Sequence, residues 1–82
     1  MFTWEFNTPE LEREALELPA EGQAALRELM DALVFDPHEF QRRPGEPTGP
    51  LRTMSFGDLG LVSVHIYDPD RLVLIVQIQW LG

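Results

Sequence analysis

The spacing of apolar residues changes halfway along this chain, and this change limits its possible folds more than any other feature. Between residues 9 and 35, apolar side chains recur every three or four positions, which is the period of a helix with one buried face. From residue 51 onward they alternate with polar residues or form a short unbroken run, as in β-strands. The sequence therefore predicts an α+β fold in which the helices precede most of the sheet.

Turn-forming residues mark where these elements begin and end. Thr8-Pro9 is typical of a helix start, whereas Pro19 and Asp36-Pro37 each end a helix. Two later turns, Gly57-Asp58-Leu59-Gly60 and Asp68-Pro69-Asp70-Arg71, separate the apolar segments of the second half. In order, we expect a strand over 2–6, helices over 9–17 and 20–35, a long surface loop over 37–50, and strands over 51–56, 61–67 and 72–80.

The arrangement of the strands is predicted by counting chain reversals. The short break at Leu18-Pro19 favours an antiparallel helix hairpin, so the first and last strands are expected to be antiparallel neighbours. The last strand then lies inside the sheet, as its apolar run over 72–76 also indicates. We therefore expect residues 1–82 to form a single β-α-α-β-β-β domain, with a four-stranded antiparallel sheet and the helix hairpin packed on one face. Trp4 and Trp80 are expected to form a cross-strand aromatic pair.

Charge and composition exclude several classes of function. Fourteen acidic residues face six arginines and no lysine, giving a formal charge of −8, so nucleic-acid binding is not expected. There is no cysteine, and His38 and His65 lie in different segments, so we expect neither a metal nor a cofactor. No apolar run approaches the ~18 residues of a membrane span, and the chain does not start with a basic signal-peptide segment. The expected location is cytoplasmic.

The order of these signals resembles a known family. Trp4-Glu5-Phe6, Thr8-Pro9-Glu10, Leu18-Pro19, Asp36-Pro37, Leu51-Arg52 and Phe56-Gly57-Asp58 together resemble the RelE/ParE toxin superfamily over nearly the whole chain. The resemblance implies a RelE-like fold and one of two activities, because RelE-like members cleave messenger RNA at the ribosome and ParE-like members poison DNA gyrase. It also implies an antitoxin-like protein partner. Fold alone does not choose between such activities.

The cations of the RNA-cleaving members are mostly missing from this chain. Cleavage requires positive groups to stabilise the transition-state phosphate, and the resemblance implies that the last three strands supply them. Here the family's arginine position falls near Leu59-Gly60 or Leu61-Val62, and the last strand ends without a basic residue. Only Arg52 lies where the family commonly has a cation. The resemblance therefore favours a relative that has lost most nuclease residues.

Three residues are the catalytic candidates. His65 and Tyr67 are two positions apart on one strand and so share a sheet face, and Arg52 comes from the neighbouring strand. In a catalytic cluster, His65 would transfer protons, Tyr67 would donate a hydrogen bond and Arg52 would hold an anion. The alternative is an ordinary polar strand face.

The binding candidates lie in the loop and the last strand. Arg42 and Arg43 are either a contact for an acidic group or solvated loop charges. Gln77 and Gln79, expected to share a face with Val73 and Ile75, and Trp80 are candidates for an open, partly apolar binding surface.

Three functions follow from these observations. We expect a non-catalytic protein-binding module of a toxin–antitoxin-type system. The alternatives are an mRNA-cleaving toxin with a reduced active site and a homo-oligomeric, homodimer-forming structural domain.

Overall fold

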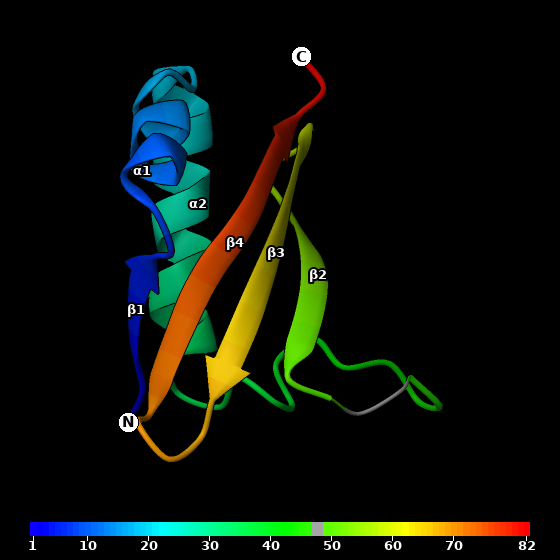
Figure 1. The fold of residues 1–82 in the computed structure, drawn as a ribbon. Helices are drawn as coiled ribbons and strands as arrows, with labels where there is room; N and C mark the ends of the chain where they lie inside the picture. The colour runs from blue at the N-terminus through cyan, green and yellow to red at the C-terminus, as the bar shows by residue number, and fades with distance from the viewer. Residues whose placement is uncertain (47–48) are drawn as a thin grey trace.

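The predicted order of elements is confirmed by a computed structural model, which describes residues 1–46 and 49–82 (Figure 1). The protein is an α+β fold with two helices and a four-stranded sheet. The elements are β1 (Thr3–Phe6), α1 (Pro9–Leu16), α2 (Ala20–Leu33), β2 (Leu51–Phe56), β3 (Gly60–Tyr67) and β4 (Leu72–Trp80). None of the described helices is both long and apolar enough to span a membrane.

The sheet is mixed, so the prediction of a fully antiparallel sheet is wrong in one place. The strand order is β1-β4-β3-β2, with β4 inside the sheet as predicted. β2 pairs antiparallel with β3, and β3 pairs antiparallel with β4. β1, however, lies parallel to the first half of β4, with Thr3 opposite Leu72 and Phe6 opposite Ile75.

The lengths of the elements explain this difference. β1 has four residues and α1 has eight, so they are only about 13 Å and 12 Å long. In Figure 1, α1 continues in the direction of β1, and the chain turns back only when α2 begins. β1 and α1 together therefore lie alongside β4. Counting α1 as a separate reversal of the chain gave the wrong direction for β1.

The core lies between the helices and one face of the sheet. The helices contribute side chains spaced three or four residues apart, and the strands contribute alternate residues. The buried core residues are Ala15, Leu18, Leu26, Leu29, Met30, Leu33, Met54, Phe56, Val62, Val64, Ile66, Val73 and Ile75. Full burial of one large apolar side chain contributes about 1.5–3 kcal/mol to folding. This face of the sheet therefore supplies half of the core that stabilises the fold.

A β-bulge in β4 changes which side chains face the core. Val64 pairs with Ile75 and Ser63 pairs with Gln77, so Val76 is an additional residue without a counterpart on β3. After the bulge, Ile78 and Trp80 pack against the core, while Gln77 and Gln79 are exposed. The expectation that the two glutamines share a face with Val73 and Ile75 is therefore wrong, because strict alternation does not hold across a bulge.

The segment expected as a surface loop over 37–50 is anchored at its start. It contains no helix or strand in its described part, but Pro37 is fully buried and Phe40 packs against the core. Turns that begin at Asp36 shape this part, since the amide of Phe40 donates to the carbonyl of Asp36 (2.9 Å). Pro47 and Thr48 of the expected loop lie outside the described residues.

Candidate functional site

One face of the sheet is not covered by any described part of the chain. In an antiparallel pair, residues directly opposite each other point to the same side. The strand registers therefore place eleven residues of β2–β4 on the side away from the helices. We call these residues, together with the half-buried Val76 of the β4 bulge, the open face. It consists of Leu51, Thr53, Ser55, Leu61, Ser63, His65, Tyr67, Leu72, Leu74, Val76, Gln77 and Gln79.

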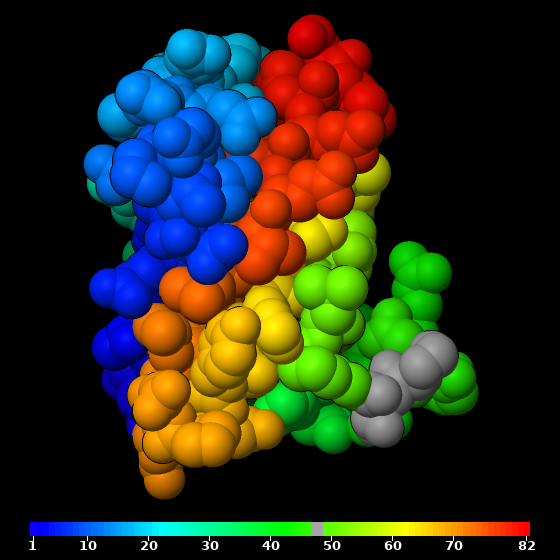
Figure 2. All heavy atoms as spheres, in the orientation of Figure 1, coloured from blue at the N-terminus to red at the C-terminus, as the bar shows by residue number. Residues whose placement is uncertain are grey.

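The open face is accessible along its whole length. None of its residues is buried, and Leu51 and Tyr67 are 62% and 38% exposed. In Figure 2, the strands β4, β3 and β2 lie side by side at the surface (orange, yellow and light green), with no helix in front of them. A contiguous, partly apolar surface of this kind usually marks an interaction site.

The open face carries no carboxylate and no arginine, although the chain has a formal charge of −8. β2, β3 and β4 contain no aspartate or glutamate, and their single arginine, Arg52, points to the opposite side. Nine of the fourteen acidic residues lie between Glu10 and Glu39, in the helical half of the chain. Charge is therefore segregated, with acidic helices on one side of the sheet and an uncharged surface on the other.

Several polar groups of the open face are already paired with one another. The hydroxyls of Thr53 and Ser63, which lie opposite each other, share a hydrogen bond of 2.9 Å. The rings of His65 and Tyr67 stack with their centroids 4.3 Å apart, as their expected common face requires. A partner would thus meet polar groups whose removal from water costs less than that of unpaired ones.

Arg52 does not join His65 and Tyr67, so the expected three-residue cluster is wrong. Arg52 lies opposite Val64, whose side chain is fully buried, and therefore points to the other side of the sheet. There its guanidinium donates to the carbonyl oxygen of Pro37 (2.7 Å) and lies 3.4 Å from a carboxylate oxygen of Glu46. With its side chain only 9% exposed, Arg52 holds the loop against the sheet.

The two loop arginines, Arg42 and Arg43, do not converge on a common anion-binding site. Arg42 is 3.1 Å from a carboxylate oxygen of Glu39 and donates to the carbonyl of Glu46 (3.4 Å), so its contacts are local. Arg43 is exposed and lines a hollow of about 240 Å³ at the edge of β2, together with Arg52 and Glu46. Their proposed role in binding stays a prediction.

Trp80 is a core residue rather than part of the open face. It packs on Phe56, with ring centroids 5.8 Å apart, and a Cβ atom at Gly22 would meet its ring at 3.0 Å. The expected Trp4–Trp80 pair does not form, because the parallel register places Trp4 opposite Val73. Trp4 instead packs edge-to-face on Phe6 at 5.5 Å.

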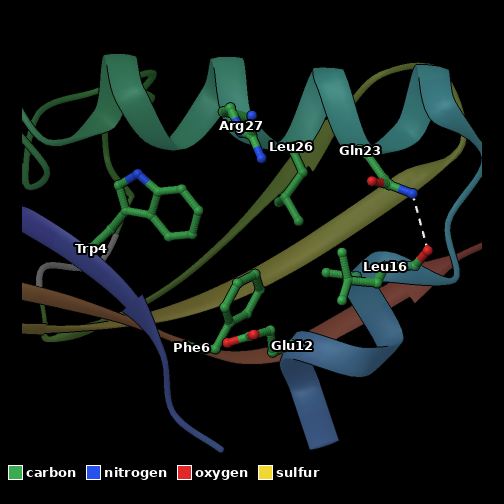
Figure 3. Close-up of a pocket in the computed structure, with 8 residues that line it drawn as sticks. Trp4, Phe6, Glu12, Leu16, Gln23, Leu26 and Arg27 are labelled. Atoms are coloured by element: carbon green, nitrogen blue, oxygen red, sulfur yellow. Dashed lines mark hydrogen bonds between the residues drawn. The ribbon is translucent and has the colours of Figure 1, made fainter. Parts of the chain in front are cut away.

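A second candidate is a small cavity between the two helices and β1 (Figure 3). Its volume is about 80 Å³, and Trp4, Phe6 and Leu26 form its apolar walls. The side-chain amide of Gln23 donates to the carbonyl oxygens of Leu16 (3.0 Å) and Leu18 (2.9 Å), which fixes the helix turn beside it. A space of this size admits a single small side chain rather than a substrate.

A larger groove of about 500 Å³ runs between α2 and the edge of β2. Ala25, Ala32 and Phe40 are among its lining residues, and Glu28 adds negative charge. Its lining therefore carries a carboxylate, whereas the open face has none.

The described residues contain no group of three or more side chains arranged to hold a metal ion. Sequence reasoning found four members of the open face, namely His65, Tyr67, Gln77 and Gln79, and missed the others, among them Thr53, Leu61 and Leu74. The signal available for these three was the alternation of β2, β3 and the first half of β4, once the register of the strands is known. Comparison with protein families, with curated proteins and with solved structures finds no match to this chain.

Proposed function

We propose that this chain is a non-catalytic protein-binding module whose interaction surface is the open face. The observation that carries the proposal is that β2, β3 and β4 present neither carboxylate nor arginine on the open face of a chain of charge −8, where Glu5 of the edge strand β1 marks the border. Depletion of charged residues at a surface that combines tyrosine with aliphatic side chains is typical of protein interfaces.

The absence of catalysis is part of the proposal. Phosphoryl chemistry on RNA needs cations close to the proton-transfer groups. His65 and Tyr67 lie on the open face, whereas Arg52 is bound on the opposite side of the sheet by Pro37 and Glu46. A toxin–antitoxin-type system, with an antitoxin-like protein among the partners, is the biological context that the resemblance to the RelE/ParE superfamily supports.

Site-specific photocrosslinking in cells that express the chain tests the proposal. A photoreactive phenylalanine analogue replaces Tyr67 on the open face or, as the matched control, Phe35, which is 72% exposed at the end of α2. We expect a protein adduct from position 67 and none from position 35. Equal adducts from both positions, or none from position 67, would contradict the proposal.

A growth assay tests the non-catalytic part. Induced expression in a sensitive bacterial host is expected to leave growth and messenger RNA intact. Growth arrest with loss of messenger RNA that His65→Ala abolishes would instead support a toxin nuclease and refute this part of the proposal.

A further inference from the structure

We infer that the occupant of the open face is a second copy of this chain, packed sheet against sheet around a twofold axis. This inference rests on the proposed function, because it names the partner of the same surface. It follows from the distribution of charge, the size of the surface and the composition of its rim.

Symmetry makes an uncharged surface a requirement for self-association. At a twofold interface, the same patch of both copies meets, so any charge near the axis faces its own like charge. Two copies with a formal charge of −8 each repel at most orientations. The open face is where β2, β3 and β4 present no carboxylate, and sheet-to-sheet packing leaves the acidic helices on the two outer sides. A different protein with basic residues could bind to the acidic helices, so it would not need an uncharged surface on this chain.

The size of the open face fits a weak dimer. Three strands about 4.8 Å apart, each with about seven residues of about 3.3 Å, give a planar area of roughly 300 Å² per copy. Side-chain relief enlarges the accessible surface, so a dimer would bury roughly 1,000 Å² in total, at the low end of specific interfaces. We therefore expect dissociation in the micromolar range rather than an obligate dimer.

The rim of the open face supports the same arrangement. Charged residues border it on two sides. Glu5 of β1 lies opposite Leu74, and Arg43 and Glu46 share a hollow with Thr53 and Ser55 at the edge of β2. A polar rim around a less polar centre is the usual anatomy of an interface. The rim carboxylates also limit the overlap of two copies to the uncharged centre.

Sedimentation of the purified chain between about 5 µM and 1 mM tests the inference. The wild type is expected to change from monomer to dimer over this range. In the double variant Gln77→Glu/Gln79→Glu, each added carboxylate keeps the shape of the amide that it replaces but meets negative charge in the partner. We expect its dimer to dissociate at least about tenfold more readily.

Ala24→Glu/Ala32→Glu is the matched control, because it adds the same two charges at exposed positions of α2. This variant is expected to dimerise like the wild type, and circular dichroism checks that both variants are folded. A wild type that stays monomeric at 1 mM overturns the inference, as does a dimer unaffected by the glutamates at 77 and 79. Monomeric wild type combined with an adduct to a different protein from position 67 would refute the second copy and retain the proposed function.

Discussion

Deletion of Val76 tests the geometry that gives the open face its composition. Val76 is the additional residue of the bulge, between Ile75 opposite Val64 and Gln77 opposite Ser63. Removing it leaves both pairings in place and turns the end of β4 into a regular strand. The glutamines stay on the open face, and Ile78 and Trp80 stay against the core.

The cost of this deletion can be compared with that of a deletion in a strand without a bulge. Without Val76, the protein loses one half-buried valine, and the free energy of unfolding should fall by about 1 kcal/mol. Deletion of Ser63 from β3, by contrast, would turn the buried Val64 and Ile66 to the open face and polar side chains toward the core. Two apolar side chains at about 1.5–3 kcal/mol each, plus the buried polar groups, amount to about 5 kcal/mol or more. A loss of that size would unfold a domain of ordinary stability.

Urea unfolding followed by circular dichroism and tryptophan fluorescence provides the measurement. Deletion of Ser63, which faces the bulge on β3, is the control, because β3 has no additional residue to lose. We expect the protein without Val76 to unfold cooperatively and the protein without Ser63 to be unfolded from the start. If both deletions abolish the fold, the register described for β4 is incorrect.

Three substitutions test contacts that position the layers, each by the midpoint of urea unfolding. Gly22→Val places a branched side chain against the ring of Trp80, because even a Cβ at this position would lie 3.0 Å from the ring. The free energy of unfolding should fall by about 1–3 kcal/mol. Wild-type stability would show that the ring can move aside. Thr8→Ala removes the side-chain acceptor that caps α1 and should cost about 1 kcal/mol, whereas Thr8→Ser should restore most of it. Arg52→Met leaves the carbonyl of Pro37 without its charged donor and should cost about 1–3 kcal/mol, and an unchanged midpoint would contradict its role as the loop anchor.

The helices, the strands and their order were predictable because each leaves a local signal in the sequence. The stripe of α2 and the alternation of β3 identify these elements without knowledge of their neighbours. The position of β4 inside the sheet was also predictable, because its first residues are apolar on both sides.

The direction of β1 and the face of each β4 residue were not predictable in this way. The parallel pairing of β1 depends on α1 being short enough to continue along the line of β1, which is a matter of tertiary packing. The bulge at Val76 leaves no mark in the sequence, since Ile75, Val76 and Ile78 are all β-forming residues. Both errors concern the relation between elements rather than the elements themselves.

The candidate site was partly predictable for the same reason. His65 and Tyr67 share a face because they are two residues apart on one strand, which needs no knowledge of other strands. The face of Arg52 depends on how β2 is aligned with β3, which the sequence does not show. Its pairing with Val64 places it on the other side of the sheet. A site that combines residues from two strands can be read from sequence only when the register is known.

Solution NMR of the isotope-labelled chain in a dilution series tests most directly whether two copies of the chain meet at the open face. Between about 20 µM and 1 mM, we expect concentration-dependent amide shifts at Ser63, Leu74 and Gln77, with the buried face of α2, such as Leu29, unchanged. Shifts confined to α2, or spectra that do not change with concentration, would contradict this self-association.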